Sequence, residues 1–259
     1  MINLKQCKEI FLNHLDQYED KSTIGFDLKL KHTFRVMKIS KDLCKKINIS
    51  REESKLAQVI ALLHDIGRFE QVRQNNSFID GEQSDHADYG VKILFDDNLI
   101  ESFIDDRKYD NIIKKAIYNH NKYKIEEGLN EKELLHCKII RDADKLDNFR
   151  VKEIEKLENI YPGTYNADTI NYETISDKIY EDFMNYKCIK IEDRKTQIDY
   201  WISIIAFIFD LNFKESKAYI KEKNYIDILI DRIEYKNTET KEKMENIRKC
   251  AKEYLENSI

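Results

Sequence analysis

The sequence predicts an all-α protein. One proline and six glycines in 259 residues are too few for the turns of a β-rich chain. Lysine, glutamate, isoleucine and leucine are abundant, and they favour helices. Apolar residues also recur at intervals of three or four, which is the spacing of one helical face. A chain of this length can bury a substantial core in one large domain or two small ones.

The first two predicted helices cover about residues 4–18 and 28–47. In the second helix His32 belongs to the apolar face, because side chains four positions apart stack on the same side of a helix. The residues of this face are Leu28, His32, Val36, Ile39, Leu43 and Ile47. We therefore expect the imidazole of His32 to point inward among aliphatic side chains.

A third helix is expected to follow Ser50, an N-cap residue, with Glu53 at the position of a capping-box acid. Gly67 predicts the C-terminal stop of this helix, so the pair His64-Asp65 falls at its end. Residues 71–84 are polar and rich in turn-forming residues, and we expect them to form a loop.

Three further predicted helices each place a ligand-type side chain on an apolar face. They are a helix capped by Ser84 or Asp85 and carrying His86, a helix over 109–121 carrying His120, and a helix from Glu131 to about Leu157 carrying Asp144. Together with His32 and the pair His64-Asp65, these helices supply six imidazole and carboxylate groups.

The helical pattern breaks at residues 161–166, a candidate boundary or a loop over the site. We expect a catalytic core over 1–160 and a helical extension over 161–259 that belongs to the same compact domain. The extension contains no histidine, which favours a supporting layer or a partner surface. Its predicted helices lie near 173–186, 192–209, 213–222, 224–233 and 238–256.

The composition excludes several classes of protein. A formal net charge of −5 gives no basic footprint for a dedicated nucleic-acid surface. The five cysteines are scattered without a Cys-x-x-Cys pair, so we expect free thiols in a reducing compartment. No apolar signal core opens the chain, and no apolar stretch is long enough to span a membrane. We expect a cytoplasmic protein.

The six inward-pointing groups predict a metal site. A polar group on the apolar face of a helix is costly unless something satisfies it. A single buried histidine is usually a hydrogen-bonded core residue, but the whole set favours metal binding. Nitrogen and oxygen ligands suit Fe, Mn, Co, Ni or Zn. Six ligands exceed the needs of one open site, whereas two ions ~3.5–4 Å apart would use them all, with the second oxygen of Asp65 as a bridge.

Two motifs resemble those of the HD superfamily, an all-helical group of metal-dependent phosphohydrolases. His64-Asp65-Ile66-Gly67 is similar to the HDIG signature, and the stretch 142–147, Asp-Ala-Asp-Lys-Leu-Asp, is similar to the C-terminal Asp motif. The resemblance covers roughly residues 25–150. It implies a helical bundle of the HD type, on which we expect the additional C-terminal helices to pack, and it selects Asp144 over Asp142 and Asp147 as the ligand.

The intermediate histidines resemble those of the binuclear branch of the superfamily. This resemblance implies a first ion held by His32, His64, Asp65 and Asp144, and a second held by Asp65, His86 and His120. The Gly-Tyr-Pro element of cyclic-dinucleotide phosphodiesterases is absent after His120, where the sequence continues Asn-Lys-Tyr-Lys. That departure argues against a cyclic dinucleotide as the substrate and leaves dinucleoside polyphosphates or small nucleotides as candidate substrates.

Arg68 and Lys145 are the candidate phosphate contacts, because each stands next to a ligand motif and is cationic. The resemblance supports a basic residue at position 68. An exposed salt bridge is the alternative for both, and Lys122 is a weaker candidate. The expected nucleophile is a metal-bridging hydroxide, with Asp65, Asp144 or another acid moving protons.

The sequence therefore predicts a metal-dependent phosphohydrolase of a nucleotide or another small phosphate ester. One alternative is a mixed-valent di-iron oxygenase of the HD fold, since such enzymes share the same order of ligands. Another is a non-enzymatic, metal-stabilised sensor or binding protein. Catalysis is favoured because structural metal sites are usually closed, whereas this set leaves coordination positions open. The oligomeric state stays open.

Overall fold

A computed structural model describes residues 2–18, 24–75, 85–160 and 166–259. The described residues form helices and connecting loops without any β-strand, so the all-α prediction is confirmed. The chain divides into two compact units, Met1–Asp144 and Lys145–Ile259. This division falls inside a helix rather than at residue 160, and the expectation of one compact domain stays a prediction.

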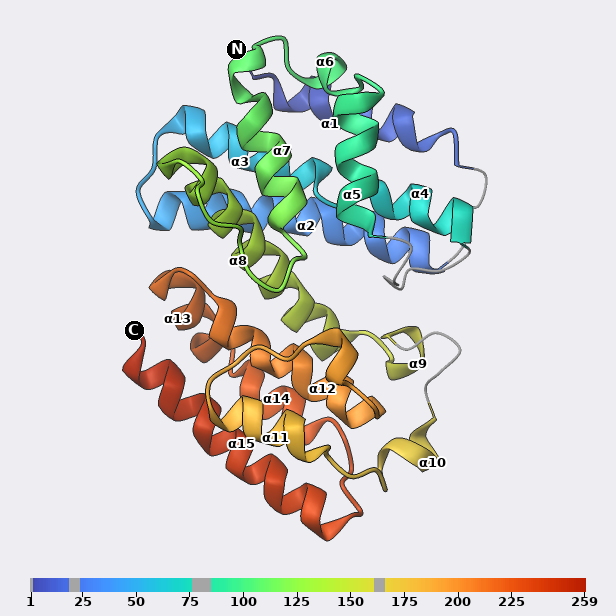
Figure 1. Ribbon diagram of the computed structural model, residues 1–259, viewed down its shortest axis with the longest axis vertical. Helices are drawn as coiled ribbons and strands as arrows, with labels where there is room; N and C mark the ends of the chain where they lie inside the picture. Colours follow the sequence, from blue (N-terminus) through green and yellow to red (C-terminus); the bar gives the residue numbers. More distant parts are fainter. Residues whose placement is uncertain (1, 19–23, 76–84, 161–165) are drawn as a thin grey trace. The chain divides into compact units, whose positions relative to one another are not determined.

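The first unit is built around helix α3 (Arg51–Leu63), of which every residue from Leu56 to Leu63 is buried (Figure 1). Helices α1, α2 and α7 pack against α3, and α4, α5 and α7 form a neighbouring group. The helices of this unit are α1 Leu4–Leu15, α2 Ile24–Lys46, α4 Ile66–Asn75, α5 His86–Val91, α6 Ile100–Phe103, α7 Asp110–Asn119 and the first part of α8 Glu131–Ile154. A π-helical turn follows α5 at Lys92–Asp96, and a short 3₁₀ helix precedes α7 at Arg107–Tyr109.

The second unit begins with the end of α8 and has its own core around Trp201, whose indole N–H donates to the carbonyl of Leu229 at 3.0 Å. A complete capping box between Thr196 and Asp199 starts α12. Its further helices are α9 Leu157–Ile160, α10 Ala167–Ile170, α11 Asp177–Met184, α12 Gln197–Ile205, α13 Lys214–Glu222, α14 Tyr225–Asp231 and α15 Thr238–Asn257, with 3₁₀ turns at Ile191–Asp193 and Ala206–Asp210. The five helices predicted beyond residue 172 are thus present, although α12 is shorter than expected and is flanked by the two 3₁₀ turns.

Two predictions around α4 are wrong. Gly67 does not end a helix, because it lies in the first turn of α4, and the polar residues from 71 onward continue this helix to Asn75. Polar side chains suit its exposed side, where Glu70 pairs with Arg73 one turn later. The rest of the predicted loop, 76–84, lies outside the described residues, as does most of the predicted break at 161–166.

The caps of the other helices follow the sequence closely. Ser50 caps α3 by accepting from the backbone N–H of Glu53 at 3.2 Å. The carboxylate of Glu53 does not close the capping box but binds Lys132 and the buried His136 of α8, each at 2.7 Å. Asp85 caps α5, whereas the alternative cap Ser84 lies outside the described residues.

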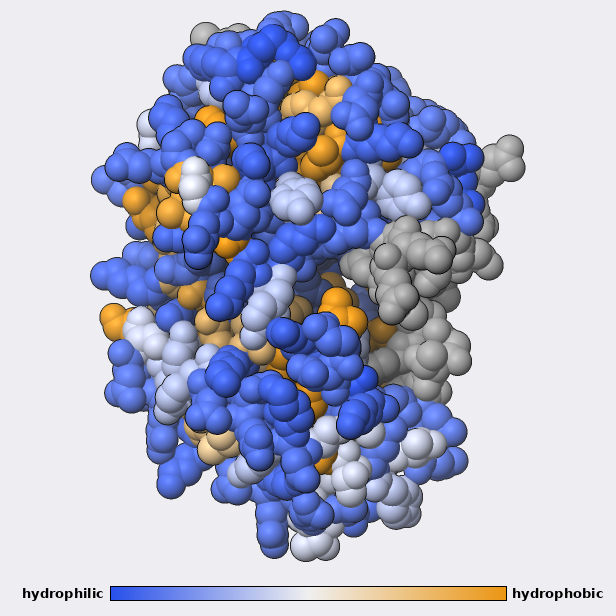
Figure 2. All heavy atoms as spheres, viewed as in Figure 1, coloured by the Kyte–Doolittle hydropathy of each residue, from blue (hydrophilic) through white to orange (hydrophobic). Residues whose placement is uncertain are grey.

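The face shown in Figure 2 is mostly hydrophilic, with hydrophobic residues in small groups. This agrees with the charged residues, 36% of the chain, covering the solvent side of the helices. Within the described part of the chain, no helix has both the length and the apolar character needed to cross a bilayer.

Candidate metal centre

The structure brings all six predicted ligands together in the first unit. We call these six residues the His/Asp cluster: His32, His64, Asp65, His86, His120 and Asp144. Five segments supply them. His32 comes from α2 and Asp144 from α8, His64 and Asp65 form the turn between α3 and α4, His86 opens α5, and His120 follows the last residue of α7. Every member except Asp144 is at most 4% exposed.

A close approach of two helices brings His86 next to the turn with Asp65. A Cβ atom on Gly67 would lie 2.1 Å from the carbonyl oxygen of His86 and 2.4 Å from the backbone nitrogen of Gly90. Only glycine leaves room for this contact between α4 and α5. Gly67 is therefore a packing residue that sets the position of His86, which explains why its prediction as a helix stop was wrong.

The substitution Gly67→Ala should consequently destabilise the fold by about 3 kcal/mol, the upper range for forcing extra atoms into a packed interface. The carbonyl and amide that the methyl group meets are backbone atoms, so α4 and α5 must separate. Chemical denaturation would measure the loss. Gly90→Ala is the matched control, because its nearest neighbour would be a side-chain methyl of Ile117 at 3.4 Å, and we expect less than about 1 kcal/mol. Equal losses in both variants would contradict this account.

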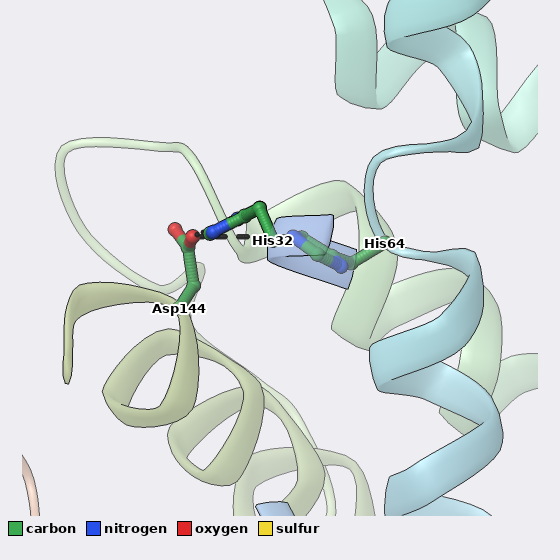
Figure 3. A group of neighbouring side chains, drawn as sticks. All are labelled: His32, His64 and Asp144. Atoms are coloured by element: carbon green, nitrogen blue, oxygen red, sulfur yellow. Dashed lines mark ion pairs between the residues drawn. The ribbon is translucent and has the colours of Figure 1, made fainter. Parts of the chain in front are cut away.

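One group of neighbouring ligands consists of His32, His64 and Asp144 (Figure 3). Figure 3 shows the imidazole of His32 pointing at the carboxylate of Asp144, and the two atoms His32 Nε2 and Asp144 Oδ1 are 3.0 Å apart. His64 Nε2 lies 3.9 Å from the same oxygen. In octahedral coordination with each ligand ~2.1 Å from the ion, adjacent ligands lie ~3 Å apart and opposite ligands ~4.2 Å apart. These separations suit one metal ion.

Asp65 faces all four histidines and divides its two oxygens between them. Oδ2 lies 3.6 Å from His32 Nε2 and 3.4 Å from His64 Nε2. Oδ1 lies 3.3 Å from His86 Nε2 and 3.9 Å from His120 Nε2. The Nε2 atoms of His86 and His120 are themselves 2.8 Å apart. A second group that could hold a metal ion contains His64, Asp65 and His120.

Backbone carbonyls set the tautomers of two imidazoles. His64 Nδ1 lies 2.8 Å from the carbonyl oxygen of Ala61, and His120 Nδ1 lies 2.6 Å from that of Ile117. An Nδ1–H that donates to a carbonyl places the lone pair of the ring on Nε2, where it can bind a metal ion. The buried Nε2 of His64 has no hydrogen-bond partner among the described residues. A buried nitrogen held in this way fits a metal ligand.

The electrostatics also favour cation binding. Burial opposes ionisation of Asp65, but the Lys29 ammonium and the neighbouring His64 and His120 hold its pKa well below the usual range. Burial likewise opposes ionisation of Asp144, yet the contact with His32 lowers its pKa. Burial lowers the pKa of His120. Ionised carboxylates and a neutral imidazole are the forms that donate to a metal ion.

The predicted cations lie in different surroundings. Arg68 Nε is 3.5 Å from Asp65 Oδ1, and its Nη1 donates to Gln71 Oε1 at 2.9 Å, so this guanidinium lies beside the cluster. Lys145 belongs to the second unit, where its ammonium pairs with Asp210 Oδ2 at 2.7 Å. Lys122 pairs with Asp85 and Asp88 beside α5. Arg68 is thus the candidate that reaches the cluster directly.

Two residues near the cluster were missed from the sequence. Lys29, one turn before His32 on α2, places its ammonium 2.8 Å from Asp65 Oδ2. Arg141, one turn before Asp144 on α8, is buried and donates to the carbonyl oxygens of Asn119 and Lys122, both at 2.6 Å. Arg141 therefore ties α8 to the turn that carries His120. Their i, i+3 spacing to a ligand was the only signal, and many lysines share it.

Comparison with known proteins supports the same region of the chain. Residues 30–148 match the family model of the HD domain, a range that contains the whole His/Asp cluster. No match was found among the curated proteins or among the solved structures.

Proposed function

Because residues 30–148 are an HD domain, we propose that this protein is a metal-dependent phosphohydrolase of a nucleotide or another small phosphate ester. The observation that carries the proposal is the division of the Asp65 oxygens between two histidine pairs. A carboxylate in this position can bridge two ions, and two-ion centres recur in enzymes that cleave phosphate esters.

In the proposed centre, His32, His64, Asp65 and Asp144 hold the first ion, while Asp65, His86 and His120 hold the second. Mixed nitrogen and oxygen ligands suit Fe, Mn, Co, Ni or Zn. Four and three protein ligands leave positions on each ion for water and substrate, as a catalytic site requires. When bound, such ions lower the pKa of water toward ~7 and neutralise charge on the phosphate.

The chain's own groups would complete the reaction. In hydrolysis a water oxygen bonds to phosphorus, the bond from phosphorus to the leaving oxygen breaks, and the water proton ends on the leaving group. Arg68, beside Asp65, would bind a phosphate oxygen and stabilise charge as it develops. The Asp144 side chain is 19% exposed against 3% for Asp65, so Asp144 is the better placed to pass a proton to solvent. The predicted phosphate contact of Lys145 stays a prediction.

The test is a panel of metals and substrates with purified protein. Generic phosphodiesters, mononucleotides and dinucleoside polyphosphates would each be assayed with Mn, Co, Ni, Fe, Zn and Mg. We expect turnover that depends on one of the transition metals. An aerobically purified protein that shows a mixed-valent iron signal in electron paramagnetic resonance and consumes oxygen, without any phosphohydrolase activity, would instead establish the di-iron oxygenase. Metal binding without turnover of either kind would favour a sensor or binding protein.

A cytoplasmic location and a small phosphate as the binding partner belong to the same proposal. The location agrees with the five free cysteines. The small phosphate agrees with the net charge of −5, which gives no basic nucleic-acid surface, and with the position of the cluster among buried side chains of a single helical unit. Activity on a mononucleotide but not on single-stranded DNA or RNA would support the small substrate.

A further inference from the structure

Lys29 competes for an oxygen that the proposed metal centre needs. Its Nζ lies 2.8 Å from Asp65 Oδ2. The same oxygen faces His32 Nε2 at 3.6 Å and His64 Nε2 at 3.4 Å. A metal ion held by these two imidazoles would therefore share Oδ2 with a lysine ammonium. Two cations on one carboxylate oxygen repel each other as they approach.

The lysine is also free to move in a way that the other groups are not. Its side chain is 27% exposed, whereas the side chains of His32 and His64 are 6% and 1% exposed. An ammonium on a flexible four-carbon stem can leave Oδ2 for solvent without any shift of α2. His32 is buried on α2, and the Nδ1 of His64 is held by the carbonyl oxygen of Ala61 at 2.8 Å.

We infer that Lys29 is a resident counter-cation of Asp65, which compensates this buried carboxylate until a metal ion arrives and which weakens the binding of that ion. This inference rests on the proposed metal centre. It adds that the chain limits its own metal affinity, so that the centre fills only at a higher concentration of free metal. A partner that merely orients Asp65 would act in the opposite direction, because loss of a supporting hydrogen bond weakens metal binding.

Removal of the Lys29 charge should therefore raise the metal affinity if Lys29 competes with the ion, and lower it if Lys29 only orients Asp65. Titration of the metal-free protein with Mn²⁺ and with Co²⁺, by calorimetry or against a chelating dye, would give the affinity of each ion that binds, and the ion lost in His64→Ala identifies the first site. We expect Lys29→Met to bind about tenfold more tightly, the effect of removing one unit charge that acts on a divalent ion from ~6 Å at the dielectric of water, the distance and screening of an ammonium that has moved to solvent. Lys29→Arg keeps the charge and should stay within about threefold of the wild type. Lys29→Gln serves the same purpose as Lys29→Met if the methionine variant does not fold.

Lys31→Met is the matched control. It removes the same charge from the same helix, but Lys31 is exposed and pairs with Asp27 at 2.6 Å, away from the cluster. Its metal affinity should not change. The metal-free Lys29→Met protein should also melt at a lower temperature than the wild type, because Asp65 loses its compensating cation, and added metal should raise its melting temperature by more.

A His64→Ala variant separates the two levels of the proposal. It should lose the first ion, because it removes a ligand of that ion, whereas the second ion keeps its proposed ligands Asp65, His86 and His120. If His64→Ala binds metal like the wild type, the proposed centre itself is wrong. If His64→Ala loses the first ion while Lys29→Met binds it equally or more weakly, the centre stands and the role assigned to Lys29 is overturned.

Discussion

Asp65→Asn is expected to remove both metal ions and to lower phosphohydrolase activity at least about 1000-fold, which corresponds to ~4 kcal/mol of transition-state stabilisation. Among the described residues, Asp65 is the one whose oxygens face all four histidines of the cluster. Asparagine keeps the size of the side chain but replaces one oxygen with an NH₂ group and removes the negative charge. Neither proposed ion then keeps its full set of anionic ligands, and a bridge is impossible.

Elemental analysis of protein loaded with metal and then freed of excess ions would count what remains, beside an assay of turnover. Asp88→Asn is the control. Its carboxylate lies two residues after His86, is 58% exposed and pairs with Lys122 at 3.3 Å. We expect this variant to keep both ions and its activity. Full metal content in Asp65→Asn would contradict the bridging role of the carboxylate.

The sequence predicted which six side chains lie together, because these residues break a strong pattern. An imidazole or a carboxylate on an apolar helical face needs a partner, and five segments each supplied such a residue. Helical periodicity also located most elements, since a buried face repeats every three or four residues. The division of the chain into two compact units had no such signal. The boundary falls within the long helix α8, and its position depends on contacts between distant parts of the chain.

Gly67 shows where local rules fail. A glycine after an apolar run is a frequent helix stop, but here the missing Cβ admits the backbone of α5. The need for that space arises from a helix that begins nineteen residues later, so no local pattern could reveal it. The contact of Lys29 with Asp65 could not be predicted for another reason. The chain has 44 lysines and arginines, and nothing near Lys29 marks it as the one that meets Asp65.

The second ion offers a test that is independent of Asp65. His120→Ala is expected to reduce the metal content from two ions to one and to lower activity about 100-fold, because the second ion loses one of its only three protein ligands. His86→Ala should have the same effect, since the Nε2 atoms of His86 and His120 are 2.8 Å apart and serve the same ion in the proposed centre. The first ion should stay, because its remaining ligands come from α2, α8 and the turn after α3.

The double variant distinguishes a shared role from two separate ones. If both histidines hold one ion, the variant that lacks both should be no worse than either single variant, because an ion can be lost only once. Additive losses would mean that the two imidazoles act separately. His14→Ala is a suitable control, since His14 lies on α1 against Gln17, outside the cluster. Activity that survives in both single variants unchanged would refute the second ion, and it would leave a one-ion enzyme built on His32, His64, Asp65 and Asp144.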